Sequence, residues 1–161
     1  MELRLRELRP SDRAALLAIL QATAVFRPEE IEVALELVDH ALAKPGQKDY
    51  LFAVAEHEGR VAGYACWGAT PGTRGTWDLY WIATDPALHG RGIGGRLMAA
   101  AEEAMRSAGG RLCVVETSSL PAYEKTRRFY LGAGYALAAR LSDYYAEGDD
   151  LCIFTRRLTG G

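Results

Sequence analysis

The stretch DPALHGRGIGG (residues 85–95) contains four glycines within six positions, with Arg91 inside the run and Arg96 directly after it. It follows TWDLYWIAT (76–84), a strand-like run rich in aromatic and β-branched residues, and it precedes a run with helical spacing of apolar residues. A helix N-terminus presents unpaired N–H groups and the positive end of the helix dipole, and glycines let an anion approach them closely. The stretch therefore predicts a phosphate or pyrophosphate site.

On either side of this stretch, the patterns predict one mixed α/β domain over residues 1–161. Pro10-Ser11-Asp12 offers a helix N-cap, and further helices are expected from Pro28 to Pro45-Gly46, from Ile93 to Gly109-Gly110, and from Pro121 to about Leu131. Strands are expected near Leu3–Leu8 and over 50–57, 60–69, 76–84, 111–117, 135–141 and 151–158. The strand 111–117 is apolar enough to be buried on both faces, and SDYYAEGDD (142–150) is typical of a polar loop.

The composition is typical of one globular domain in the cytoplasm. The chain has 161 residues, is 49% hydrophobic and 25% charged, and has a net charge of −2, which argues against a general nucleic-acid binder. It contains no apolar run of the roughly 20 residues that cross a bilayer, and its first twelve residues are unlike a signal peptide. Cys66, Cys113 and Cys152 lie far apart in apolar runs, which favours buried, reduced thiols over a nucleophilic cysteine, for which Cys113 is the candidate. The scattered histidines do not predict a metal site.

A dinucleotide site is the first alternative for the glycine stretch. Gly90, Gly92 and Gly95 match the G-x-G-x-x-G pattern, and Glu116 follows at about the distance of a ribose-binding acid. In that pattern the first glycine turns directly off the strand, whereas here five residues separate Thr84 from Gly90. A nucleotide-dependent oxidoreductase is therefore disfavoured, and the lack of a G-K-[S/T] sequence argues against a P-loop.

Two segments together resemble the GNAT N-acetyltransferase superfamily. The run from Thr84 to Gly94 is similar to the family's V-x-P-x-x-(R/Q)-G-x-G-x-(G/A) segment, with Thr84 in place of valine and His89 in place of Arg or Gln. The segment TRRFYLGAGY (126–135) resembles the family's A-x-x-F-Y-x-x-x-G-F segment. The resemblance implies a mostly antiparallel, twisted mixed sheet of about seven strands flanked by about four helices.

The resemblance also implies acetyl-CoA as cofactor and direct transfer of its acetyl group to an amine. The backbone N–H of Ile82 would stabilise the thioester oxyanion, the backbone of Thr84 would pair with the pantetheine arm, and the Tyr130 hydroxyl would protonate the departing thiolate. The remaining cofactor contacts are expected from His89, Gly90, Arg91, Gly92, Ile93, Gly94, Gly95 and Arg96. Lys125, Arg127 and Arg128 lie on the helix expected near the adenosine end.

The amine must lose a proton before it reacts, and a carboxylate can accept that proton. Asp78 and Glu116 are the two candidates by their positions on strands. The walls of the acceptor pocket are expected from Phe26, Arg27, Tyr80, Trp81, Tyr144 and Tyr145. Asp143, Glu147, Asp149 and Asp150 are candidates to attract a cationic amine, although such a run is also typical of a solvated turn.

The sequence leaves the acceptor open among small amines, amino acids, antibiotics and the amino groups of peptides or proteins. A non-catalytic coenzyme A sensor on the same fold is the second class of function, because a fold does not fix an activity. The sequence predicts no nucleic-acid or membrane partner, and an exposed strand edge leaves a homodimer open.

Overall fold

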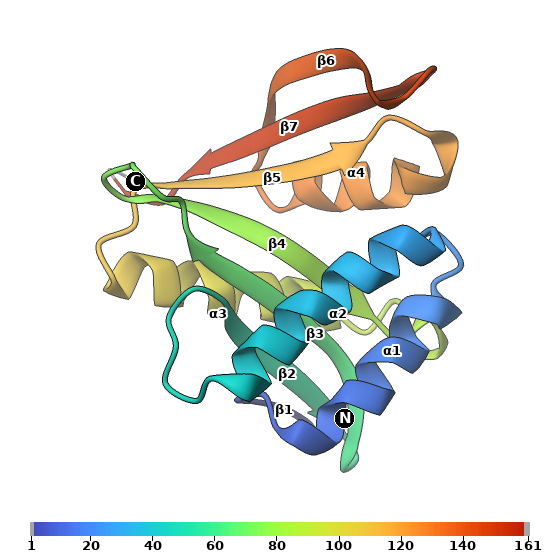
Figure 1. Ribbon diagram of the computed structural model, residues 1–161, viewed down its shortest axis with the longest axis vertical. Coiled ribbons are helices and arrows are strands. Elements are labelled where there is room, and N and C mark those ends of the chain that lie inside the picture. The colour runs from blue at the N-terminus through green and yellow to red at the C-terminus, as the bar shows by residue number, and fades with distance from the viewer. Residues whose placement is uncertain (1, 160–161) are drawn as a thin grey trace.

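The protein is built around a seven-stranded mixed sheet with the strand order β1-β2-β3-β4-β5-β7-β6 (Figure 1). The computed structural model describes residues 2–159, so Met1, Gly160 and Gly161 of the expected domain lie outside the described residues. All neighbouring strands are antiparallel except β4 and β5, which run parallel. The strands are β1 (Leu3–Arg6), β2 (Leu51–His57), β3 (Arg60–Ala69), β4 (Thr76–Thr84), β5 (Leu112–Ser118), β6 (Ala136–Ala146) and β7 (Asp149–Arg157). The expected fold class is confirmed.

Four α-helices cover the two faces of this sheet. Helices α1 (Arg13–Ala22) and α2 (Pro28–Ala43) lie on one face, and α3 (Ile93–Ser107) and α4 (Glu124–Gly132) lie on the other (Figure 1). Leu16, Leu20 and Val38 of the first pair are fully buried against β2 and β3, and Leu97 and Met105 of α3 are fully buried on the opposite face. Helices α1, α2 and α3 therefore each bury the apolar stripe that their sequence spacing predicts.

The sheet splits between its two parallel strands. The ladder joins Thr76–Leu79 of β4 to Leu112–Val115 of β5, and beyond it the two strands diverge (Figure 1). A β-bulge lies where the split begins, because Cys66 of β3 faces Trp81 while Trp67 faces Leu79, which leaves Tyr80 without a partner. A bulge bends its strand and increases the local twist. The bulge therefore helps to turn the end of β4 away from β5.

Asp12 occupies the N-cap position of α1, within the segment that the sequence predicts, but its side chain makes no capping hydrogen bond there. Residues Pro10–Asp12 form a short 3-10 turn, and the Asp12 carboxylate accepts hydrogen bonds from the Arg9 amide and from both terminal nitrogens of Arg6, each at 2.8 Å. Burial works against ionisation of Asp12, but these bonds outweigh it and lower its pKa. The side chain is 2% exposed, so it anchors β1 to the start of α1 as a buried ion pair.

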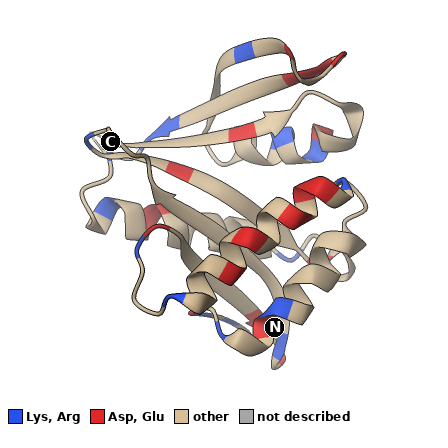
Figure 2. Ribbon diagram, viewed as in Figure 1, with Lys and Arg blue, Asp and Glu red and all other residues tan. Residues whose placement is uncertain are grey.

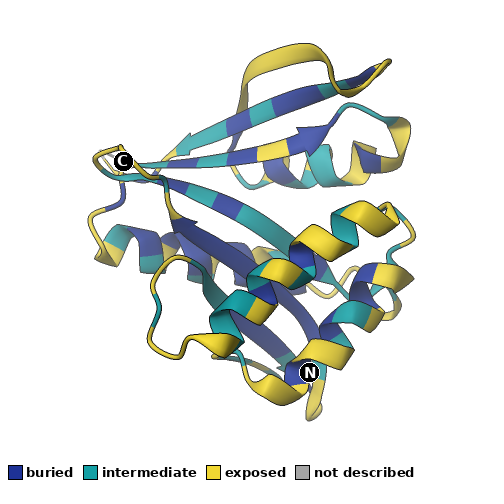
Figure 3. Cartoon of the chain, in the orientation of Figure 1, coloured by how far each residue is buried: buried dark blue, intermediate teal, exposed yellow. Residues whose placement is uncertain are grey.

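The region after residue 135 differs most from the sequence prediction. Most of the expected polar loop 142–150 is strand, because β6 continues to Ala146 and β7 starts at Asp149. Every residue of β6 is exposed, as Figure 3 shows, so polar side chains there cost little. The strand 111–117 was expected to be buried on both faces, but Glu116 is exposed because the split in the sheet uncovers it. Among residues 2–159, no helix is both long and apolar enough to span a bilayer.

Candidate active site

A cavity of about 560 Å³ lies at the split between β4 and β5. It combines residues from α2, β4, β5, the start of α4 and the β6–β7 hairpin. The structure brings most of the predicted catalytic and acceptor-pocket residues into its walls, namely Phe26, Arg27, Asp78, Tyr80, Trp81, Ile82, Glu116, Tyr130, Tyr145 and Asp149. The predicted cofactor residues Thr84 and 89–96 lie outside this lining. Segments far apart in the sequence thus form one pocket.

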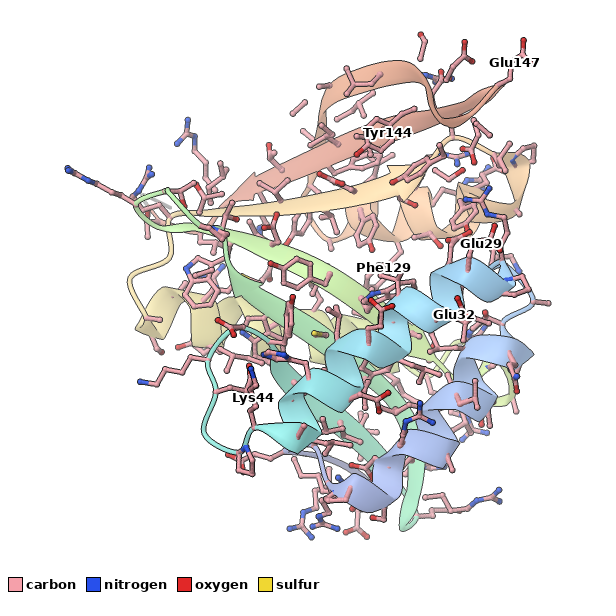
Figure 4. The ribbon with its side chains drawn as sticks, in the orientation of Figure 1. Glu29, Glu32, Lys44, Phe129, Tyr144 and Glu147 are labelled. Carbon is pink, nitrogen blue, oxygen red and sulfur yellow. The ribbon has the colours of Figure 1, made fainter. Side chains whose placement is uncertain are left out.

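Tyr144 is the predicted wall residue that the structure places elsewhere. Its side chain is 56% exposed on β6 and is not part of the cavity lining (Figure 4). Its ring packs edge-on against that of Tyr145, with ring centres 5.0 Å apart, and only Tyr145 reaches the cavity lining. Asp143, Glu147 and Asp150 also lie outside the lining. Asp150 instead accepts hydrogen bonds from Arg140 and from the Asp143 amide, which closes the hairpin.

Beyond the end of the ladder, the side of β4 that faces β5 carries backbone groups that the sheet does not pair. The Asp85 amide donates to the Ala62 carbonyl of β3 at 2.8 Å. Ala83 and Trp81 lie two and four residues before Asp85, so their backbone amides also point toward β3. Because the direction of backbone groups alternates along a strand, the amides of Ile82 and Thr84 point toward the β5 side. The parallel ladder has already ended at Leu79, so these amides border the split.

The glycine loop lies between this edge and the start of α3. Gly92 occupies the N-cap position of α3 in a left-handed conformation, with φ of +75°, and Ile93 begins the helix as a buried residue. A Cβ atom added at Gly90 or Gly92 would meet no other atom within 4 Å, whereas one at Gly94 would lie 3.2 Å from the Phe129 ring. The first two glycines therefore leave open space around the free amides of the helix N-terminus, and Gly94 allows α3 to pack against α4.

The basic residues expected near the cofactor have varied surroundings. His89 and Arg91 are exposed on the loop, and Arg91 borders a second cavity of about 380 Å³ beside the β2–β3 turn. Arg96 donates to the Leu3 carbonyl at 3.4 Å. On α4, Lys125 is exposed, Arg128 pairs with Glu124, and Arg127 donates to the carbonyls of Ser118 and Leu120. Arg127 therefore holds the segment after β5.

The two candidate carboxylates both line the cavity, one on β4 and one on β5, where Figure 2 shows an acidic band on each strand. Asp78 pairs with Val114 inside the ladder, and Glu116 lies two residues further along β5, beyond the last pair. Asp78 accepts a hydrogen bond from the Thr70 hydroxyl at 2.7 Å. Glu116 has no hydrogen-bond or ion-pair partner within residues 2–159. Partial burial and, to a lesser degree, the charge of Asp78 raise the pKa of Glu116. The two carboxylates therefore have different environments: Asp78 is engaged by a neighbouring hydroxyl, and Glu116 is not.

Tyr130 lies on the wall of the cavity at the buried side of α4. It is 5% exposed and packs among Phe129, Tyr135 and Phe154, with ring-centre distances of 5.7 to 6.0 Å. Its hydroxyl makes no hydrogen bond to any other described residue. Burial, with a smaller contribution from Cys113, raises the pKa of Tyr130. The phenol is therefore protonated at neutral pH and free to donate.

The mouth of the cavity contains residues that sequence reasoning missed. The Tyr123 hydroxyl donates to both carboxylate oxygens of Glu30, at 2.9 and 2.7 Å, across 93 positions of sequence. Arg27 donates to the same carboxylate at 3.0 Å, and the Ser118 hydroxyl donates to Asp149. Phe26 packs edge-on against Trp81, with ring centres 5.1 Å apart. Arg27 and Glu30 are only three residues apart, but no local signal predicts the other contacts, because each of those joins segments that meet only in the folded chain.

The chain is similar to proteins of known family and structure. A model of the acetyltransferase (GNAT) family matches residues 15–135. A crystal structure assigned to that family, from Desulfovibrio desulfuricans, shares 40% identity over 98% of this chain and 100% of its own, with a TM-score of 0.94. The comparison with curated proteins gave no significant match.

Two more distant structures share the fold. Ard1 from Thermoplasma volcanium is 21% identical over 99% of each chain, with a TM-score of 0.80. The PaiA N-acetyltransferase from Thermoplasma acidophilum, solved in complex with coenzyme A, is 18% identical over 98% of this chain and 99% of its own, with a TM-score of 0.73.

Proposed function

The chain belongs to the GNAT acetyltransferase family, and on that basis we propose that it transfers an acetyl group from acetyl-CoA directly to a primary amine of a small molecule or peptide. One observation carries the proposal. On the β4 side, the split in the sheet has unpaired backbone amides and the glycine-capped start of α3. A cavity lined by carboxylates and a buried tyrosine lies at the same split.

The backbone provides most of the proposed cofactor site. Acetyl-CoA would supply the acetyl group as a thioester, and its long, flexible arm suits an edge with free N–H groups such as those of Ile82 and Thr84. Its pyrophosphate suits the first turn of α3, where Gly90 and Gly92 leave open space around the amides. The relative with bound coenzyme A supports the same cofactor for this chain.

The cavity residues divide the chemical work. The Ile82 amide is proposed to stabilise the negative charge that develops on the thioester oxygen. An amine of pKa about 10.4 is mostly protonated at neutral pH, and a nearby carboxylate can take its proton. The acceptor ammonium gives up two protons over the whole reaction. One proton reaches the departing thiolate by way of Tyr130, and the other passes to solvent.

Glu116 is proposed as the general base in preference to Asp78. The Asp78 carboxylate is already engaged by the Thr70 hydroxyl, whereas the Glu116 carboxylate has no such partner within residues 2–159 and is free to contact the amine. The raised pKa of Glu116 brings it closer to the pH at which it would act.

A thiol-release assay with acetyl-CoA and a panel of primary amines tests this function. We expect amine-dependent release of one thiol per acetylated product, identified by mass spectrometry. Thermal-shift measurements with coenzyme A and with NAD run beside it. Stabilisation by coenzyme A without turnover on any amine would favour a sensor, and stabilisation by NAD alone would favour an oxidoreductase.

A further inference from the structure

The charges in the cavity do not balance. Four carboxylates line it, from Glu30, Asp78, Glu116 and Asp149, against the single guanidinium of Arg27. Arg27 and the Tyr123 hydroxyl both bond to Glu30 and so account for that charge. Asp78, Glu116 and Asp149 have no basic partner within residues 2–159, which leaves three negative groups facing one space.

Asp149 is the most buried member of this set. It is 4% exposed at the start of β7, and its carboxylate accepts a hydrogen bond from the Ser118 hydroxyl. Ser118 in turn accepts a hydrogen bond from the Leu120 amide at 3.0 Å, which fixes its position. A carboxylate held in a buried place without a cation is costly, and a bound ammonium group would remove that cost.

The spacing of the acidic groups can be read from the sheet. Glu116 and Ser118 are two residues apart on β5, so their side chains share a face and lie roughly 6.6 Å apart along the strand. Asp149 is bonded to Ser118, so it lies about one side chain beyond Glu116 along this face. Tyr145 lines the same cavity as both carboxylates. Burial, and then the charges of Glu116, Tyr144, Asp149 and Glu30, raise the pKa of Tyr145 to about 12.

Aromatic side chains line the same cavity as the charged groups. Tyr80 and Trp81 of β4 and Tyr145 of β6 face the cavity, and the Tyr50 and Tyr80 rings meet at 5.5 Å between centres. Aromatic faces attract cations and pack well against methylene chains. The walls therefore suit an aliphatic chain that carries positive charge at more than one point.

We infer that the acceptor is a linear diamine, or a polyamine that contains such a unit, with one amino group at Glu116 and Asp78 and a second held as an ammonium by Asp149. This inference rests on the proposed acetyl transfer. The reacting amine gives its proton away and so offsets little of the negative charge. A second cationic group compensates Asp149 throughout the reaction, which a monoamine cannot do.

Paired substrates of equal length test the inference on the unmodified protein. Cadaverine carries an amino group at each end of a five-carbon chain, pentylamine lacks the second amino group, and 5-aminopentanoate replaces it with a carboxylate. We expect kcat/KM at saturating acetyl-CoA to be at least about tenfold higher for cadaverine than for pentylamine, and lowest for 5-aminopentanoate.

A substitution at Asp149 tests whether this residue causes the expected preference for cadaverine over pentylamine. In Asp149→Asn, the cadaverine-to-pentylamine ratio of kcat/KM is expected to fall toward one. Glu103→Gln is the matched control, because Glu103 is 73% exposed on α3 and lies outside the cavity lining, and the ratio should stay unchanged. The ratio does not depend on the folded fraction of either variant, so a partly unfolded preparation still reports on specificity.

The outcomes separate the two proposals. Equal kcat/KM for cadaverine and pentylamine, or a clear preference for the amino terminus of a peptide, would overturn the diamine inference and leave acetyl transfer intact. An unchanged ratio in Asp149→Asn would also overturn it. If no amine releases thiol, the acetyl transfer itself is wrong, and the acceptor inference falls with it.

Discussion

The burial of Tyr130 fixes the role that its hydroxyl can have. A phenol with a raised pKa stays protonated over the working range of most enzymes, so this hydroxyl can donate to an oxygen or sulfur placed in the cavity. Removal of this hydroxyl leaves the ring in its aromatic cluster, so the fold should be little affected.

Tyr130→Phe is therefore expected to lower kcat by about 100-fold or more, the usual effect of losing a general acid. The affinity for coenzyme A should change little, because the proposed pyrophosphate site is made by backbone groups of another element. Steady-state kinetics and calorimetry measure the two quantities. An unchanged kcat would remove Tyr130 from the reaction.

At the same scale, the pair Asp78 and Glu116 predicts a pH dependence. Glu116 must be ionised to accept a proton, so kcat/KM should fall as pH drops through its pKa. That pKa is raised by burial and by the charge of Asp78, so the acidic limb should lie above the ordinary glutamate value of about 4.3.

The variants Glu116→Gln and Asp78→Asn separate the two carboxylates. The first should lower kcat/KM by about 100-fold and abolish the limb. The second should keep most of the rate and move the limb to lower pH, because it removes a like charge. Loss of activity in Asp78→Asn alone would transfer the role of general base to Asp78.

At the scale of the element, the start of α3 combines a conformational requirement with a proposed binding role. Gly92 has φ of +75° and open space around it, and Gly72 in the turn between β3 and β4 has φ of +76° and equally open space. Only Gly92 caps a helix. The two glycines thus form a matched pair.

Gly92→Ala and Gly72→Ala should each reduce the free energy of unfolding by about 1–2 kcal/mol, since alanine is strained at positive φ. Gly92→Ala alone should also weaken coenzyme A binding by about tenfold, because the first-turn amides would shift. Urea denaturation and calorimetry give the two values. Equal coenzyme affinity in both variants would contradict the proposed pyrophosphate site.

Which elements the sequence could predict depends on how local their signals are. The strand–loop–helix around residues 76–107 was predictable because glycines and apolar spacing mark it within the segment itself. The length of β6 was not, because a strand exposed on both faces needs no apolar alternation, and SDYYAEGDD therefore looked like a loop. The contact of Glu30 with Tyr123 was beyond prediction, since it depends on how α2 and the start of α4 meet.

At the scale of the whole molecule, the split divides the sheet into two parts. One part contains β1, β2, β3 and β4, and the other contains β5, β7 and β6. Only four residues of β4 pair with β5. A ligand that lies in the split contacts both parts and should stabilise the fold as a whole.

Coenzyme A at about 100 times its Kd should add about 2.7 kcal/mol to the free energy of unfolding and raise Tm by about 5–10 °C. NAD at the same concentration should leave Tm unchanged. Differential scanning calorimetry at several ligand concentrations measures both. A larger shift with NAD would reject the proposed cofactor.

The positions of the three cysteines have a consequence for a protein that would produce a thiol at every turnover. Cys66, Cys113 and Cys152 are all buried, and burial raises the pKa of Cys66 and raises that of Cys113 to about 12. A protonated thiol out of contact with solvent reacts slowly with disulfides. Coenzyme A released by the proposed reaction, even after oxidation, would therefore find none of these three cysteines accessible for a mixed disulfide, so the folded protein should escape inactivation by its own product under oxidative stress.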